Sequence, residues 1–217
     1  MDIIEQARKI LNTTYIPWLE LDLEFPVDLW KQQVLEVEPY FNEYRQSDSS
    51  QWSSCCLHGL GIDKTYTADN YGYDEYNAPY QYTDLAYKTP AITVFWKYQF
   101  PAERYSRIRF MKIGPGGHID WHNDGNLPPG IEPLDAVLPI NLAITHPLNC
   151  EMEIEGHGVV PWKEGKIFMI NISKNHAVFN RSSKSRVHMI ANIILGNRKK
   201  EFCEMFVRCY NKQYGQI

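Results

Sequence analysis

The sequence predicts a mainly β protein, an antiparallel sandwich or barrel with helices at both ends of the chain. From residue 91 onward, short runs rich in β-branched and aromatic residues follow one another, and Gly, Pro or Asn separates them. No helical pattern of about ten residues interrupts these runs, which disfavours a parallel sheet joined by crossover helices. Helical spacing of apolar residues is confined to the two ends, so we expect helices to cover a β core.

Three helices are expected outside this core. Apolar residues recur at helical spacing in residues 1–11, in residues 28–44 and in the tail that begins at Gly196. Residues 15–26 are expected to be extended or looped. Short strands are expected at residues 52–57, 91–95, 106–113, 118–122, 138–145, 150–154, 166–171, 177–180 and 186–195.

We expect a single domain, because 217 residues with 44% hydrophobic content suffice for one sizeable core. Its parts are a helical and loop-rich N-terminal layer (residues 1–90), a β core (91–196) and a C-terminal helix (197–217).

Segment 66–87 is rich in tyrosine and lacks aliphatic periodicity, which predicts a long ordered loop. Such a loop either shapes the mouth of a binding site or packs on the surface.

Composition excludes several classes of protein. The net charge of −4 and the pI near 6.0 disfavour a nucleic-acid partner, because no basic surplus neutralises phosphates. No apolar run is long enough to span a membrane, and the N-terminus lacks the apolar region of a secretory signal. The five cysteines are odd in number and two are adjacent, which predicts reduced thiols. A cytoplasmic protein is therefore expected.

Four residues of types that bind metals alternate in the stretch IGPGGHIDWHND, residues 113–124: His118, Asp120, His122 and Asp124. Alternate residues of a strand share a face, so each His-x-Asp pair would offer an imidazole nitrogen and a carboxylate oxygen to one ion. Alternation does not choose between the two pairs. A helix would instead place His118 and His122 one turn apart, as in zinc proteases, but Ile119 stands where their general-base Glu is needed.

A third ligand and an anion-binding residue follow later in the chain. His176 comes after the apolar run 166–170, and Arg186 opens the last expected strand. Two histidines and one carboxylate form the facial triad of non-haem Fe(II) oxygenases, which leaves positions open for a cosubstrate and O₂. The planar guanidinium of Arg binds a carboxylate through two hydrogen bonds, which suits 2-oxoglutarate.

Two blocks of the sequence resemble the aspartyl/asparaginyl β-hydroxylase family of Fe(II)- and 2-oxoglutarate-dependent oxygenases, a group related to proline cis-hydroxylases. The first block, RIRFMKIGPGGHIDWHND, has the family's strand, Pro-Gly and Ile-x-x-His-x-Asp. The second, WKEGKIFMINISKNHAVFNRSSKSRVHMI, has an apolar strand, His-x-Val-x-Asn and an Arg ten residues past the His. The resemblance spans residues 104–195 and implies a double-stranded β-helix fold.

The resemblance also implies a site. Ile119 matches the family's Ile, which makes His122, Asp124 and His176 the expected Fe(II) ligands. Arg186 matches the residue that pairs with the distal carboxylate of 2-oxoglutarate. Family members usually carry an Arg and a His near the start of the strand after His-x-Asp, where this chain has Val137 and Pro139; Asn141 is the expected substitute for binding the C1 carboxylate.

The implied activity is a dioxygenase reaction that hydroxylates an amino acid or the side chain of a peptide or protein. Two other classes stay open. One is a non-catalytic β-barrel that binds a metal or a carboxylate, and the other is a hydrolytic zinc enzyme.

Three further residues have open roles. Arg107 and Arg109 share a strand face that leads toward the site. We prefer a solvated sheet edge for them, and a substrate carboxylate site is the alternative. His188 lies two residues past Arg186, and it either lines the pocket or packs in the core.

Overall fold

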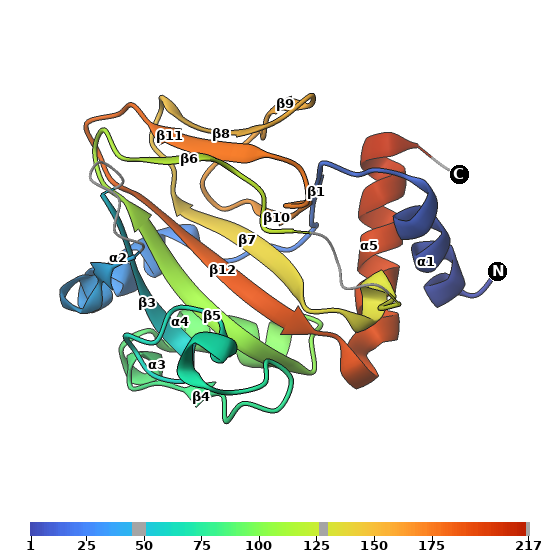
Figure 1. Ribbon diagram of the computed structural model, residues 1–217, viewed down its shortest axis with the longest axis horizontal. Helices are drawn as coiled ribbons and strands as arrows, with labels where there is room; N and C mark the ends of the chain where they lie inside the picture. Colours follow the sequence, from blue (N-terminus) through green and yellow to red (C-terminus); the bar gives the residue numbers. More distant parts are fainter. Residues whose placement is uncertain (45–50, 126–129, 216–217) are drawn as a thin grey trace.

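The computed structural model describes residues 1–44, 51–125 and 130–215, and within them two antiparallel sheets face each other (Figure 1). The larger sheet has the strand order β1 (Trp18–Glu20), β10 (Ile167–Ile170), β7 (Leu138–Thr145), β12 (Arg186–Ile194), β5 (Arg104–Ile113), β3 (Trp52–Gly59) and β2 (Asn42–Glu43), with β4 (Gln81–Tyr82) paired to β3. The smaller sheet has the order β6 (His118–His122), β11 (His176–Asn180), β8 (Cys150–Ile154) and β9 (Gly158–Val159).

Between β5 and β12 the chain passes back and forth between the two sheets. β5, β7, β10 and β12 belong to the larger sheet, and β6, β8, β9 and β11 belong to the smaller one. Every connection in this stretch except the one from β8 to β9 therefore crosses from one layer to the other, which is the arrangement of a double-stranded β-helix. The predicted fold class is confirmed, and the bounds expected for residues 118–122, 138–145 and 150–154 coincide with β6, β7 and β8.

Two apolar layers hold this architecture together. Between the sheets, side chains of the larger sheet such as Ala143 and Phe168 pack with Met152 and Val178 of the smaller sheet. The other face of the larger sheet packs against α2 (Val27–Val37), α3 (Leu85–Lys88) and α4 (Pro90–Val94), with Trp30 fully buried in that layer. Helices thus cover one face of the larger sheet and leave its other face to the space between the sheets.

The first and last helices close one end of the molecule. α1 (Ile3–Thr13) lies beside α5 (Lys199–Tyr214) (Figure 1). Gln213 of α5 accepts a hydrogen bond from the backbone N–H of Glu20 and donates one to the Glu20 carbonyl, which joins the helix to β1. The predicted tail helix is confirmed, although residues 216–217 of its expected range lie outside the described residues.

One expected strand is wrong. Residues 91–95 belong to α4 and to the first residue of a π-helical segment, Phe95–Gln99. Pro90 occupies the first turn of α4, where its fixed φ favours a helix. Ile92, Phe95 and Trp96 are buried at helical spacing, so packing against the larger sheet overrides the strand preference of their side chains.

The N-terminal layer contributes more to the sheets than its helical pattern indicates. β1 and β3 both extend the larger sheet. Short 3₁₀ segments lie at Glu38–Tyr40, Ala68–Tyr71, Pro133–Asp135 and Gly196–Arg198.

All five cysteines are buried and none forms a disulfide. In the described part of the chain, no helix has both the length and the apolar character needed to cross a membrane.

The turn between β5 and β6 is held by Asn180 at the end of β11. The backbone N–H of Gly116 donates to the Asn180 carbonyl at 2.8 Å, and the Asn180 N–H donates to the Gly117 carbonyl at 2.9 Å. The Asn180 side-chain amide donates to the carbonyls of Ile113, Gly114 and Lys184. Gly116 has a φ of 75°, which favours glycine. This buried side chain therefore fixes where β6 starts relative to β11.

Replacing Asn180 by Ala is expected to lower the free energy of unfolding by about 2–4 kcal/mol, because carbonyl groups around a buried amide lose their donor. The midpoint of urea denaturation measures this change. Asn42→Ala is the matched control, because Asn42 is exposed on β2 and its amide donates to one carbonyl, that of Tyr40. Its expected effect is within about 0.5 kcal/mol. Equal shifts in the two variants would contradict a clamping role for Asn180.

Candidate functional site

Pairing between β6 and β11 places two histidines directly opposite each other. The antiparallel register aligns His122 with His176, and the centroids of their rings are 4.3 Å apart. Asp124 follows just beyond the end of β6, where its backbone N–H donates to the Ile172 carbonyl at 3.1 Å. One hydrogen-bond ladder and one loop contact thus bring His122 and Asp124 together with His176, which is distant in sequence.

The three side chains converge through their metal-binding atoms. The Asp124 carboxylate lies 3.9 Å from Nε2 of His122 and 3.8 Å from Nε2 of His176. One ligand atom from each residue can be chosen so that all lie within 4.8 Å of one another. Two imidazoles and one carboxylate are the donor set of the facial triad expected from the sequence.

Backbone hydrogen bonds fix the tautomer of both imidazoles. Nδ1 of His122 is 2.7 Å from the Asp120 carbonyl, and Nδ1 of His176 is 3.0 Å from the Lys174 carbonyl. A carbonyl only accepts, so each Nδ1 carries the proton and each Nε2 keeps its lone pair. Burial lowers the pKa of His176, which favours the neutral form that binds metals. The donor set therefore fits a divalent cation.

The other His-x-Asp pair is directed away from this group. The register shifts so that Val178 pairs with Ile119 while His176 pairs with His122, which leaves an extra residue in β6. Because of this bulge, Ile119 and His122 both line the cavity. The expectation that all four alternating residues share a face is wrong. The Asp120 side chain is 84% exposed and lies 3.4 Å from Nε2 of His118, and neither residue lines the cavity.

A cavity of about 370 Å³ adjoins the three ligand atoms and extends between the sheets. The smaller sheet contributes Ile119, His122 and His176, and the larger sheet contributes Arg186 and Asn141. The structure therefore places every residue of the expected site around one cavity.

Arg186 enters this cavity from the first position of β12 and is only 5% exposed. Its Nη2 donates to Nδ1 of His188 at 2.8 Å, and Nε2 of His188 lies 3.0 Å from Nδ1 of His146. A guanidinium only donates, so His188 accepts at Nδ1 and donates from Nε2. Burial lowers the pKa of His188 well below its usual value and that of His146 to about 4. These neutral histidines orient the guanidinium.

The charge of Arg186 has no carboxylate partner among the described residues. Burial lowers the pKa of Arg186 to about 10, so the side chain is still cationic at neutral pH. Its Nε is buried and lacks a hydrogen-bond partner in the part of the chain that the structure describes. A buried cation in this state stabilises a bound anion.

Asn141 and Asn192 are the amides of the cavity wall. Asn141 of β7 is 6% exposed and is aligned with Ile190 of β12. Asn192 lies two residues beyond Ile190, and its Oδ1 is buried without a partner among the described residues. Asn192 is absent from the site predicted from the sequence, although alternation along β12 from Arg186 to Ile190 and Asn192 indicates it.

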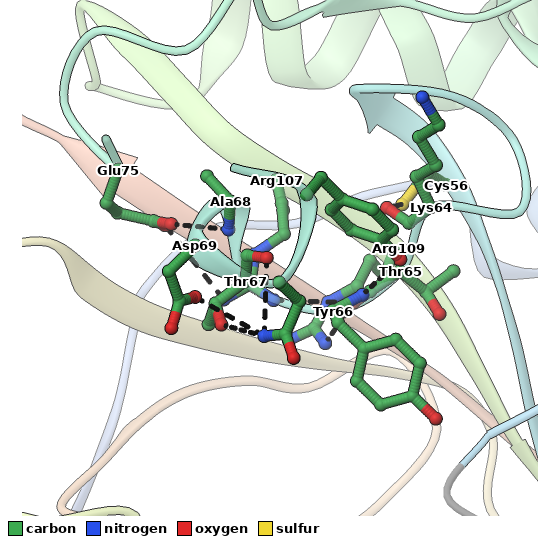
Figure 2. A network of polar contacts seen from close by, with 12 residues as sticks. Cys56, Lys64, Thr65, Tyr66, Thr67, Ala68, Asp69, Glu75, Arg107 and Arg109 are labelled. Carbon is green, nitrogen blue, oxygen red and sulfur yellow. Dashed lines mark hydrogen bonds and ion pairs between the residues drawn. The ribbon is translucent and has the colours of Figure 1, made fainter. Parts of the chain in front are cut away.

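Arg107 and Arg109 also line the cavity, from β5. They are 6% and 7% exposed, so the preferred interpretation as a solvated sheet edge is wrong. Figure 2 shows their guanidinium groups beneath the loop that carries Thr65 and Thr67. This loop covers the face of β5 that was predicted from the sequence to be exposed to solvent.

The sequence profile of the aspartyl/asparaginyl beta-hydroxylases matches residues 27–194, which include all the cavity residues named above. Among curated proteins, no sequence matches the chain.

Several solved structures share the fold at low sequence identity. An oxidoreductase of the 2OG-Fe(II) oxygenase family from Burkholderia pseudomallei has a TM-score of 0.52 at 10% identity, over 89% of this chain and 91% of that one. A prolyl hydroxylase from Trichoplax adhaerens, in complex with a hypoxia inducible factor peptide fragment, has a TM-score of 0.54 at 10% identity, over 91% of both chains. The non-heme alpha-ketoglutarate-dependent carbocyclase SnoK has a TM-score of 0.50 at 13% identity, over 88% and 83%.

These structures share the double-stranded β-helix, and the profile covers most of the sequence. The chain belongs to the aspartyl/asparaginyl β-hydroxylase family.

Proposed function

We propose that the protein is an Fe(II)- and 2-oxoglutarate-dependent dioxygenase that hydroxylates an amino acid or the side chain of a peptide or protein. One observation supports this most strongly. His122, Asp124 and His176 direct ligand atoms toward one point at the wall of a cavity that also contains a buried cation without a carboxylate partner. A metal ligand set and an anion anchor in one cavity are what this chemistry requires.

The roles of the residues follow from their donors and charges. His122 and His176 would bind Fe(II) through Nε2, and Asp124 would supply the carboxylate oxygen. Arg186 would pair with the distal carboxylate of 2-oxoglutarate, because its guanidinium has donors left after the bond to His188. Asn141 would donate from its amide to the C1 carboxylate.

Bound Fe(II) and 2-oxoglutarate would supply the oxidation of a substrate C–H bond to C–OH by O₂, with release of succinate and CO₂. The protein's own contribution is orientation and exclusion of water. Ile119 and Val178 flank the ligands on the smaller sheet and keep that wall of the cavity apolar.

The Trichoplax adhaerens hydroxylase is a complex with a peptide, and SnoK is described as a carbocyclase, so the shared fold accommodates substrates of different kinds. Both an amino acid and a peptide side chain are therefore compatible with this fold.

His122→Ala is expected to reduce Fe(II)-dependent succinate formation from 2-oxoglutarate by at least about 100-fold, because loss of a metal ligand exceeds the 10- to 100-fold effect of losing an outer hydrogen bond. The assay needs no substrate, because 2-oxoglutarate oxygenases release some succinate in uncoupled turnover. His157→Ala is the matched control, since His157 is exposed and stacks on Tyr15 away from the cavity.

Three outcomes would contradict the proposal. Full turnover in His122→Ala would exclude this ligand set. Iron binding by the wild type without succinate formation would indicate a non-catalytic binding protein. Activity that needs zinc and no O₂ would indicate a hydrolase.

His188→Leu is expected to raise KM for 2-oxoglutarate about 10-fold, because the Arg186 guanidinium loses the charged hydrogen bond that orients it. His188→Asn should restore part of the affinity, since its side-chain oxygen can replace the acceptor at Nδ1. Steady-state kinetics at saturating Fe(II) measures both. An unchanged KM in His188→Leu would show that the histidine does not position Arg186.

A further inference from the structure

Arg107 and Arg109 form a second cationic group in the cavity. Both are more than nine-tenths buried, and they lie two residues apart on the same face of β5. That face points into the cavity that the metal ligands line. The proposed reaction uses neither residue.

Most contacts of these two guanidinium groups are to neutral oxygens. Nη1 of each arginine donates to the Thr65 carbonyl, at 3.3 Å from Arg107 and 3.0 Å from Arg109. Arg109 also donates to the Tyr44 hydroxyl at 3.2 Å. The Nε atoms of both arginines are buried without a partner among the described residues. Donors therefore exceed acceptors around the pair.

The charge of the pair is only partly balanced. Oε1 of Glu75 lies 4.0 Å from Nη2 of Arg107, and Oε2 of Glu75 accepts from the backbone N–H of Ala68 at 3.1 Å. Arg109 forms no ion pair within the described ranges. Burial, and then the charge of Arg109, lowers the pKa of Arg107 to about 10, so the Arg107 guanidinium stays cationic at neutral pH. Two cations and one carboxylate leave a net charge near +1, which a monoanion would neutralise.

This group is separate from the Arg186 anchor. Along β12, Arg186 is aligned with Ile113 of β5, Ile190 with Arg109, and Asn192 with Arg107. Along β12, Arg186 is four residues from Ile190 and six residues from Asn192, which corresponds to about 13–20 Å of strand. The two cationic groups therefore start from separate positions along the sheet that forms the cavity wall.

We propose that Arg107 and Arg109 bind a carboxylate of the primary substrate, so that the enzyme acts on carboxylate-bearing compounds. The inference rests on the proposed dioxygenase function. The planar fork of a guanidinium suits a carboxylate, and the net charge near +1 matches a monoanion better than a phosphate dianion. Arg186 holds 2-oxoglutarate at one end, and the arginine pair holds the substrate at the other.

The test compares acids with their neutral amides. The probes are the free amino acids against their α-amides, and acetylated, amidated tripeptides with a central Asp or Glu against the same peptides with Asn or Gln. The readout is substrate-stimulated succinate formation above the uncoupled rate. We expect stimulation by free amino acids or by acidic peptides, and a loss of about 10- to 100-fold for the matching amide. The responding series identifies the source of the carboxylate.

Variants then assign the effect to the pair. In Arg109→Gln, KM for the stimulating acid should rise about 10- to 100-fold, and the preference for acid over amide should disappear. Arg109→Lys keeps the positive charge but lacks the planar guanidinium, so its KM for the acid should lie between the values of the wild type and Arg109→Gln. Lys112→Gln is the matched control, because Lys112 is on the same strand but pairs with Glu38 and does not line the cavity.

Three results would overturn the inference: equal stimulation by acids and amides, no stimulation by any acid in the panel, or a rise in KM for 2-oxoglutarate in place of the substrate in Arg109→Gln. Failure of the wild type to form any succinate with Fe(II) would instead remove the proposed dioxygenase function. The comparison of acids and amides uses the wild type, so it does not depend on the folding of a variant.

Discussion

The pairing of β6 with β11 is the constraint on which the rest of the site depends. The register sets His122 opposite His176, and the bulge between this pair and the pair Ile119–Val178 rotates the end of β6 into the cavity. Without that extra residue, His118 and Asp120 would share the face of His122 by simple alternation. Asn180, at the other end of β11, fixes the turn that starts β6, so the same strand sets both the position and the register of the ligands.

Electrostatics divides the cavity into three regions. The ligand atoms of His122, Asp124 and His176 lie on the smaller sheet and its adjoining loop. Arg186 lies on β12 of the larger sheet. The pair formed by Arg107 and Arg109 lies on the neighbouring strand β5, further along the sheet. Each cationic region is buried, and neutral hydrogen-bond partners orient the guanidinium groups without cancelling their charge. Such an interior is costly without bound anions, and this cost favours ligands that carry carboxylates at suitable positions.

The sequence predicted the strands of the β core well, because period-two patterns bounded by Gly, Pro and Asn report local structure directly. It failed at residues 91–95, where burial of Ile92 and Trp96 against the sheet outweighs strand propensity. Alternation also could not choose between the two His-x-Asp pairs, since the bulge depends on a partner strand more than fifty residues away. The resemblance to a family supplied that choice. Arg107 and Arg109 were correctly placed on one face, but their burial depends on the loop at Thr65, which no periodicity reports.

The most direct test of the account is a crystal structure of the protein with Mn(II), which replaces Fe(II) without oxidising the site. The account predicts one ion bound by Nε2 of His122, Nε2 of His176 and a carboxylate oxygen of Asp124, beside the cavity that contains Arg186. An ion held by His118 and Asp120, or imidazoles of His122 and His176 that do not share an ion, would contradict it.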